Sequence, residues 1–192
     1  MIEIKNISKK FGKLEVLKNV SASCNSGQCI ALIGPNGCGK TTLIKSILGM
    51  VIPDSGSMEF NQKSIFGDYL YREKIGYMPQ IGRYPDTMTI GEIIEMVKKI
   101  RNSKDNLDED LFRDFEIEKM LNKQMRTLSG GTTQKISAVL AFMFNPDVLI
   151  LHEPTAGLDA LAAEVLKEKI IKEKGKGKLI LITSHLLSEL DD

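Results

Sequence analysis

Apolar residues follow two different patterns along the chain. Short continuous apolar runs, such as those at residues 148–151 and 179–183, are typical of strands buried in a parallel sheet. Residues 89–101 instead carry apolar side chains at helical spacing, which predicts an amphipathic helix. The complete pattern predicts strands at residues 2–11, 14–20, 28–33, 57–60, 74–78, 148–151 and 179–183, and helices at 40–48, 89–101, 131–144 and 158–173, with two short helices within 111–128.

The order of these elements indicates an α/β protein. Strands that alternate with helices predict a mostly parallel central sheet. The two N-terminal strands, on either side of a Gly12-Lys13 turn, are expected at an edge. The pattern becomes mainly helical after the fifth predicted strand and then returns to strand. We therefore expect one domain, residues 1–192, with a core at 1–80 and 146–192 and an inserted α-helical subdomain at 81–145.

Composition narrows the class of protein. The hydrophobic fraction of 42% and charged fraction of 27% are ordinary for a globular protein, and the net charge of +1 argues against a general nucleic-acid surface. The three cysteines lack metal-ligand spacing, so we expect free thiols in a reducing compartment. We see no signal-peptide layout and no apolar run of membrane-spanning length. A cytoplasmic location is therefore expected.

The strand predicted at residues 28–33 has the composition of a buried strand. A glycine-rich segment after it matches the pattern G-x-x-x-x-G-K-[ST]. Its glycines let backbone N–H groups turn toward phosphates, and the following helix adds partial positive charge at its N-terminus. Lys40 can reach the terminal phosphates, and the Thr41 hydroxyl can ligate Mg²⁺. We therefore predict a nucleoside triphosphate site. The candidate residues are Gly34, Pro35, Asn36, Gly37, Cys38, Gly39, Lys40, Thr41 and Thr42.

A second anion-binding pattern discriminates among triphosphate-binding proteins. Ser129, Gly130 and Gly131 follow Leu128 at the start of a predicted helix, where backbone amides can hold an anion. The segment resembles the signature motif of ATP-binding cassette (ABC) proteins. The resemblance implies a P-loop NTPase fold with an N-terminal antiparallel β subdomain and an inserted helical subdomain. It also implies a dimer in which each signature loop closes over the ATP of the opposite protomer.

Further residues occur in the order that the family shows. Gln80 resembles the Q-loop glutamine, which the family uses at Mg²⁺ and the attacking water. Glu153 resembles the catalytic glutamate, and a carboxylate there can orient or deprotonate water for attack on the γ-phosphate. The segment ending at Asp159 resembles the D-loop, and His185 the H-loop histidine at the γ-phosphate. Phe11 stands where the family stacks an aromatic ring on adenine, although an aromatic in an N-terminal strand is also compatible with the core.

Two residues depart from the family pattern. Thr132 replaces the usual glutamine after the signature glycines. His152 stands where the family's Walker B motif has an aspartate that holds Mg²⁺, a cation that prefers oxygen ligands to imidazole. We therefore expect weakened Mg²⁺ binding and slow hydrolysis, with ATP binding partly retained. Three interpretations remain open: an impaired natural or engineered variant, a binding-only regulatory subunit, or a site suited to a metal that imidazole binds.

The resemblance implies the ATP-hydrolysing subunit of an ABC transporter, with ATP and Mg²⁺ as cofactors. Such a subunit lies at the inner face of the cell membrane through a membrane-spanning partner, which would dock near the segment from Ile81 to Met88. That segment could equally be an ordinary exposed loop. Other open functions are a hydrolysis-impaired regulatory module and a soluble ABC ATPase acting on ribosomes or DNA. Compared with the family, the chain also has a shortened C-terminus.

Overall fold

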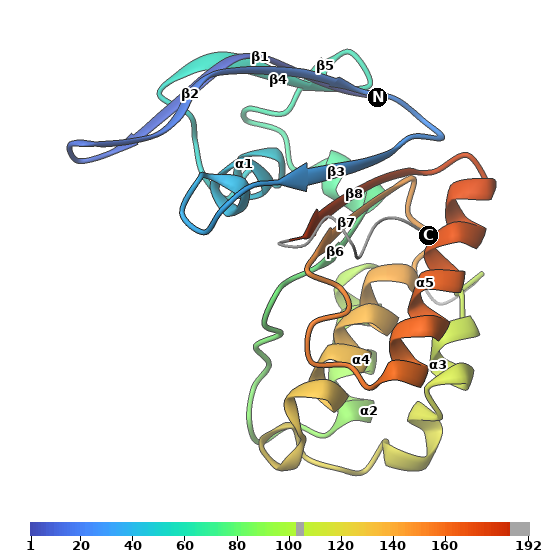
Figure 1. The fold of residues 1–192 in the computed structure, drawn as a ribbon. Coiled ribbons are helices and arrows are strands. Elements are labelled where there is room, and N and C mark those ends of the chain that lie inside the picture. The colour runs from blue at the N-terminus through green and yellow to red at the C-terminus, as the bar shows by residue number, and fades with distance from the viewer. Residues whose placement is uncertain (103–105, 185–192) are drawn as a thin grey trace.

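The computed structural model describes residues 1–102 and 106–184 and contains two sheets of four strands each (Figure 1). The first sheet is antiparallel with the order β2-β1-β4-β5. Its strands are β1 (Ile2–Phe11), β2 (Leu14–Cys24), β4 (Ser55–Phe60) and β5 (Lys63–Ser64). The expected N-terminal antiparallel subdomain is therefore present. β2 is longer than the predicted strand at 14–20, since residues up to Cys24 pair with the start of β1.

The second sheet is parallel and has the order β3-β8-β7-β6, as the alternation of strands and helices predicts. Its strands are β3 (Cys29–Ile33), β8 (Leu179–Ser184), β7 (Val148–His152) and β6 (Ile75–Met78). Every residue of β7 is buried, which explains its continuous apolar run. The expectation that strand 28–33 is buried is wrong. β3 lies at the edge of the sheet within the described residues, and alternate side chains, including Ile33, are exposed.

Helix α1 (Lys40–Ile47) lies between the two sheets (Figure 1). Its buried residues Ile44 and Ile47 pack in one core with the antiparallel sheet and with one face of the parallel sheet. A 3-10 helix, η1 (Leu70–Lys74), precedes β6 and was not predicted. Its Tyr71 is buried in the same core and donates a hydrogen bond to the carbonyl of Ile47 at 2.8 Å. This core holds α1 beside both sheets, and with it the glycine-rich segment that precedes the helix.

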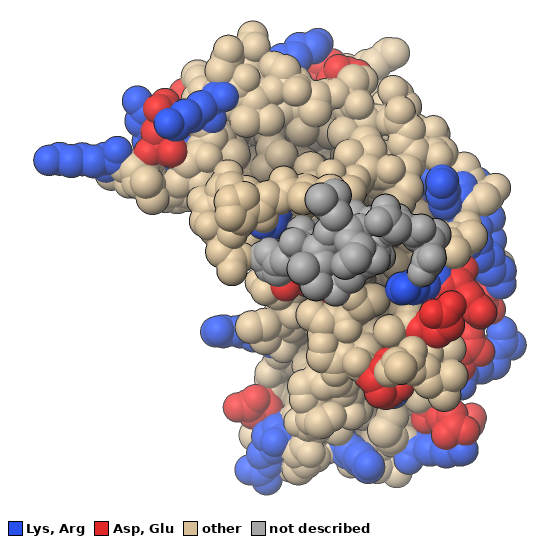
Figure 2. Space-filling view, in the orientation of Figure 1, with Lys and Arg blue, Asp and Glu red and all other residues tan. Residues whose placement is uncertain are grey.

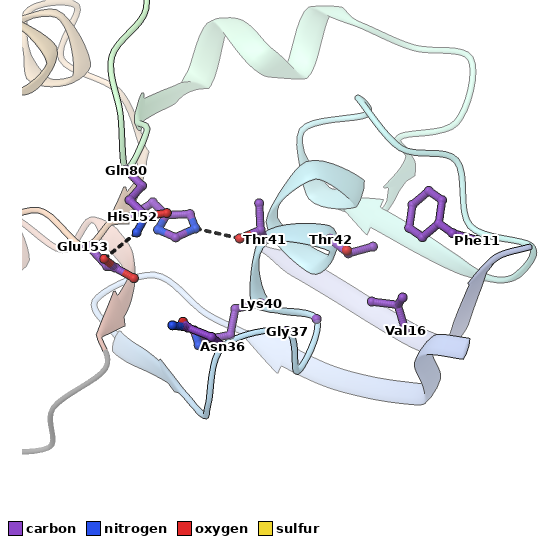
Figure 3. Close-up of a pocket in the computed structure, with 11 residues that line it drawn as sticks. Phe11, Val16, Asn36, Gly37, Lys40, Thr41, Thr42, Gln80, His152 and Glu153 are labelled. Carbon is purple, nitrogen blue, oxygen red and sulfur yellow. Dashed lines mark hydrogen bonds between the residues drawn. The ribbon is translucent and has the colours of Figure 1, made fainter. Parts of the chain in front are cut away.

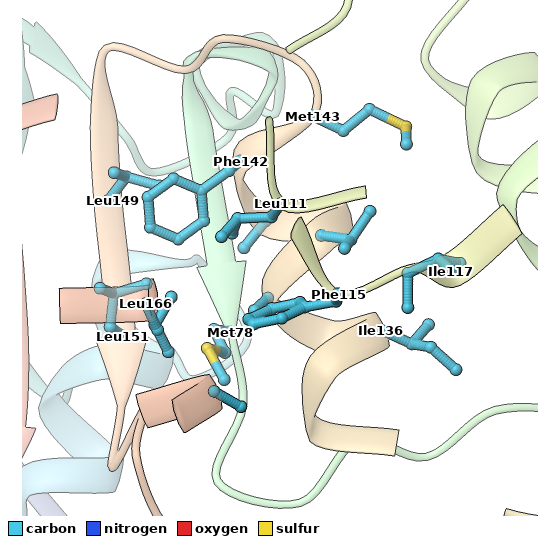
Figure 4. Close-up of a cluster of buried hydrophobic side chains, with 14 of the residues drawn as sticks. Met78, Leu111, Phe115, Ile117, Ile136, Phe142, Met143, Leu149, Leu151 and Leu166 are labelled. Carbon is cyan, nitrogen blue, oxygen red and sulfur yellow. The ribbon is translucent and has the colours of Figure 1, made fainter. Parts of the chain in front are cut away.

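Helices cover the other face of the parallel sheet. They are α2 (Ile90–Ile100), α3 (Asp110–Asp114), α4 (Gly130–Phe142) and α5 (Ala160–Gly175), with 3-10 turns η2 (Ile117–Met120) and η3 (Met125–Thr127). Phe142 and Phe115 pack with Leu149 and Leu151 of β7, so the helices and the sheet share one core (Figure 4). The two short helices predicted within 111–128 are wrong in detail, because the structure has one short α-helix followed by two 3-10 turns.

Side chains at the helix N-termini set where two of these helices begin. Thr89 accepts a hydrogen bond from the Glu92 backbone N–H, and Glu92 accepts one from the Thr89 backbone, a reciprocal capping box. Asp159 accepts a hydrogen bond from the Ala162 N–H at 2.9 Å, so α5 begins at Ala160 and not at residue 158. Both caps satisfy backbone groups that a helix N-terminus leaves unpaired.

From the sequence alone, the charged run at residues 98–110 predicts a solvated helix face and loop. In the structure this run ends in a buried ion cluster. Lys169 of α5 has a side chain 3% exposed, and its ammonium lies 2.5 Å from Asp108, 2.8 Å from Asp110 and 3.0 Å from Glu173. Burial alone would lower the pKa of Lys169, but its hydrogen bonds to the three carboxylates raise it. The cluster ties α5 to α3. On the visible face, basic and acidic side chains intermingle over these two helices (Figure 2).

Replacing Glu173 by glutamine should lower the free energy of unfolding at pH 7 by about 3 kcal/mol, because the buried ammonium of Lys169 loses one of its three carboxylate partners. Burial raises the pKa of Glu173, but Lys176, Lys178 and Lys169 outweigh it and lower that pKa to about 2. The stabilisation is therefore present above the ordinary pKa near 4.5 and is lost as pH falls toward 2.

Urea unfolding followed by circular dichroism between pH 7 and pH 2.5 measures this difference for the Glu173→Gln variant. The exposed Glu168 on the same helix supplies the control, and Glu168→Gln should change little at any pH. A Glu173→Gln penalty that grows on acidification would contradict the role of the ionised carboxylate.

Within residues 1–102 and 106–184, the structure has no helix both long and apolar enough to cross a bilayer. Cys24, Cys29 and Cys38 are free thiols, as expected, and burial raises the pKa of the Cys24 and Cys29 thiols.

Candidate nucleotide-binding site

The glycine-rich segment connects β3 to α1, the context that a phosphate-binding loop requires. Gly39 caps α1 with a φ of 103°, and a Cβ there would meet the Val16 carbonyl oxygen at 2.8 Å. The position therefore needs glycine for both its conformation and its space. The ammonium of Lys40 donates to the carbonyls of Gly34 and Pro35, the latter at 3.1 Å. Backbone amides, a helix N-terminus and an ammonium are thus gathered in one loop.

A pocket of about 270 Å³ lies over this loop (Figure 3). Phe11 and Val16 stand at one end, and Gln80 and Glu153 at the other. Phe11 is 51% exposed, with the Lys9 ammonium 5.5 Å from its ring centroid, so it is a surface aromatic and not a core residue. The lining consists of Phe11, Val16, Asn36, Gly37, Gly39, Lys40, Thr41, Thr42, Gln80, His152 and Glu153.

Two predicted catalytic residues meet at the edge of the pocket. Gln80 follows β6 and Glu153 follows β7, and these neighbouring parallel strands end at the same edge of the sheet. The amide of Gln80 donates a hydrogen bond to a carboxylate oxygen of Glu153 at 2.7 Å. Glu153 has a φ of 51°, a left-handed conformation uncommon outside glycine, at the turn after β7. The arrangement fixes the direction of a carboxylate that could orient water.

Backbone contacts hold the unusual conformation of Glu153. Its N–H lies 3.1 Å from the Thr183 carbonyl oxygen and 3.2 Å from the Thr183 hydroxyl oxygen. Its own carbonyl lies 3.5 Å from the side-chain amide of Gln134, a buried residue of α4. The turn is thus attached both to the neighbouring strand β8 and to the helix that begins with the Ser-Gly-Gly segment.

His152 is the last residue of β7 and is 3% exposed. Its Nε2 lies 2.9 Å from the Thr41 hydroxyl oxygen, and its Nδ1 lies 3.1 Å from the Thr183 hydroxyl oxygen. The imidazole therefore bridges the phosphate loop and β8. Figure 3 shows its contact with Thr41. Because each hydroxyl can donate or accept, a neutral ring satisfies both contacts in either tautomer.

The side chains around Thr41 do not fit a Mg²⁺ ion. Mg²⁺ requires oxygen ligands in near-octahedral geometry, but the nearest partner of the Thr41 hydroxyl is an imidazole nitrogen. Among the residues that the structure describes, no group of three or more histidine, cysteine or acidic side chains could hold a metal ion.

The Ser-Gly-Gly segment lies outside the pocket lining and begins helix α4. Ser129 is the N-cap: its hydroxyl accepts from the Thr132 N–H at 3.2 Å and contacts the Thr132 hydroxyl at 2.9 Å. A Cβ on Gly131 would meet the Gly157 carbonyl oxygen at 2.6 Å, whereas one on Gly130 would meet nothing within 4 Å. The open side of Gly130 therefore faces away from the rest of this chain.

The D-loop candidate is connected to the same helix. Lys135 of α4 lies 2.9 Å from Asp159, and this contact, with the Ala162 backbone N–H, holds the pKa of Asp159 below its ordinary value. His185, the remaining catalytic candidate, lies outside the described residues.

The segment from Ile81 to Met88 is partly anchored. Tyr84 bonds through its hydroxyl to the Ser137 hydroxyl at 2.9 Å, and burial raises its pKa. Met88 packs against the helical core, whereas Ile81 is 69% exposed and Arg83 is exposed. Tyr84 and Met88 therefore serve mainly internal packing.

Two residues at the site were missed from the sequence. Val16 of β2 lines the pocket beside Phe11, and Thr183 of β8 bonds to His152. Thr183 is a polar residue at the end of an apolar run, a signal that could have identified it from the sequence. Val16 has no comparable signal, because a valine in a strand is ordinary.

Fold and pocket together define a P-loop nucleotide-binding domain. The family model described as ABC transporter matches residues 17–156. The chain therefore belongs to the ABC transporter family, as its nucleotide-binding domain. It is 32% identical to the ABC-type transporter ATP-binding protein EcsA of Bacillus subtilis, over 98% of this chain and 78% of that protein.

The chain is also 30% identical to the Nod factor export ATP-binding protein I of Ralstonia nicotianae, over 100% of this chain but 61% of the relative. It thus spans less than two thirds of that protein's length. Among solved structures, an ATP-binding subunit of an ABC transporter superimposes with a TM-score of 0.89 at 32% identity, covering 97% of this chain and 80% of that one. A dimeric cassette bound to ADP and Pi, MJ0796, shares the fold with a TM-score of 0.87 at 24% identity, over 98% and 90% of the two chains.

Proposed function

We propose that this chain is the ATP-binding and ATP-hydrolysing subunit of an ABC transporter, acting on a separate membrane-spanning subunit from the cytoplasmic side. The observation that carries the proposal is the pocket in which the phosphate loop meets Gln80 and Glu153. The ammonium of Lys40 and the loop amides would hold the triphosphate, and Phe11 would stack on the base. The Glu153 carboxylate, directed by the Gln80 amide, would orient the attacking water.

ATP-dependent dimerisation completes the proposed mechanism. The signature segment offers amides and an open face at Gly130 but lies outside its own chain's pocket. A second copy could bring this face to the exposed side of the nucleotide. Dimer formation and release would then move the helical segment 81–145, with the exposed Ile81 and Arg83 as contacts to the membrane subunit.

A hydrolysis-impaired regulatory module is the second candidate function, and the contact between His152 and Thr41 favours it. Of the proposed metal ligands, Thr41 and Gln80 supply oxygen atoms, but an imidazole stands where the family has a carboxylate. Turnover in Mg²⁺ is therefore expected to be slow, while the phosphate loop still binds ATP.

The Gly130→Asp variant tests dimerisation. A side chain at Gly130 meets nothing within its own chain, and a carboxylate is tolerated at a helix N-terminus, so folding should be unchanged. The carboxylate would repel the partner's triphosphate, so the nucleotide-induced dimer should weaken by at least about tenfold. Sedimentation velocity with a non-hydrolysable ATP analogue measures the dimer.

The matched control is Gly130→Asn, which has nearly the same shape without the charge and should weaken the dimer less. Both variants should bind ATP as monomers with unchanged affinity, because Gly130 does not line the pocket. An undiminished dimer in Gly130→Asp would refute the proposed exchange of signature loops.

A further inference from the structure

We propose that this site binds a nucleoside triphosphate without a divalent cation, with His152 in place of the metal-holding carboxylate. The inference rests on the proposed function, since it assumes that the phosphate loop binds ATP. It starts from the observation that the Thr41 hydroxyl has an imidazole nitrogen 2.9 Å away.

A directed series of hydrogen bonds reaches the pocket through this imidazole. The Glu153 N–H donates to the Thr183 hydroxyl oxygen, which lies 3.1 Å from His152 Nδ1. In the tautomer that has its proton on Nε2, Nδ1 accepts the hydrogen of the Thr183 hydroxyl. A neutral imidazole that accepts at Nδ1 carries its proton on Nε2 and donates it to the Thr41 oxygen. The Thr41 hydroxyl hydrogen is then directed to a phosphate oxygen. In this arrangement Thr41 is a donor to the phosphate and not a metal ligand.

The balance of charge supports the same conclusion. An aspartate at position 152 would place a second anion beside the phosphates, and a cation between the two would be needed to offset their repulsion. The imidazole of His152, which is 3% exposed, brings no negative charge there. The Lys40 ammonium and the N-terminus of α1 remain to attract the triphosphate. Glu153, the carboxylate that lines the pocket, accepts a hydrogen bond from Gln80.

Isothermal titration of the full chain with a non-hydrolysable ATP analogue, in excess Mg²⁺ and again in EDTA, tests the proposal. The two dissociation constants should agree within about threefold. In His152→Asp the affinity should become at least about tenfold weaker in EDTA than in Mg²⁺, because carboxylate and phosphates then require the cation. His152→Asn has nearly the same shape as His152→Asp but no charge, and it should show little dependence on Mg²⁺.

The outcomes separate this inference from the proposed function. Binding that is lost in EDTA for the unmodified chain overturns the inference alone. Absence of binding in both buffers overturns the proposed function and the inference with it. Equal Mg²⁺ dependence in His152→Asp and His152→Asn also overturns the inference, because the charge at position 152 would then have no effect. Circular dichroism establishes that both variants fold.

Discussion

Replacing Lys40 by methionine should weaken ATP binding by about a hundredfold or more, because each charge-assisted hydrogen bond contributes about 1.5–3 kcal/mol. The ammonium lies at the glycine-rich loop, within contact of two loop carbonyls. A triphosphate in the pocket would offer its oxygens to this ammonium in their place. Methionine keeps a similar unbranched stem and removes the charge, so the loss is electrostatic and not a packing defect.

Titration with a non-hydrolysable ATP analogue measures this loss, with Lys45→Met as the matched control. Lys45 lies on the same helix, in its last turn, and is exposed outside the pocket. That variant loses the same formal charge and should retain affinity within about twofold. Equal losses in both variants would mean that general charge, and not the loop, attracts the nucleotide.

Replacing His152 by aspartate should raise ATP turnover in Mg²⁺ by about tenfold to a hundredfold, a range typical of changes that restore metal binding. A carboxylate next to the Thr41 hydroxyl supplies an anionic oxygen ligand for Mg²⁺, which the imidazole does not. The gain should appear in kcat more than in the affinity for ATP, because Lys40 and the loop amides are unchanged.

Phosphate release at saturating ATP measures this rate. A second substitution tests whether the rate depends on Glu153. Adding Glu153→Gln to the His152→Asp chain should lower the rate of ATP turnover by about a hundredfold, because the amide cannot accept a proton from water. A rate unaffected by Glu153→Gln would exclude Glu153 as the residue that activates the attacking water. Equal rates for the unmodified chain and His152→Asp would discard the idea that His152 limits hydrolysis.

Local structure was well predicted where one short segment contains all of its own determinants. The phosphate loop is such a case: its glycines, its lysine and the flanking strand and helix are consecutive in the chain. Helix α2 is another, because its apolar spacing and the Thr89–Glu92 capping box are local. The mostly parallel sheet also followed, since alternating strands and helices restrict the ways in which strands can pair.

Burial was less predictable, because it depends on neighbours that are distant in sequence. The run at residues 28–33 has the composition of a central strand, yet β3 is at the edge of the described sheet. Asp108 belongs to a charged run, but its side chain is only 8% exposed and pairs with Lys169, which is far along the chain. Neither position differs locally from an ordinary strand or an ordinary solvated loop.

The sequence by itself determined that this protein has a phosphate loop, a signature segment and a histidine in place of the Walker B aspartate, because each is a short run of consecutive residues. Only the tertiary structure decided what that histidine contacts. Strand pairing brings Thr183 opposite His152, and the path of the phosphate loop brings Thr41 to its other nitrogen. Contacts of this kind depend on register and side-chain direction across separate elements, and no local pattern of residues encodes them.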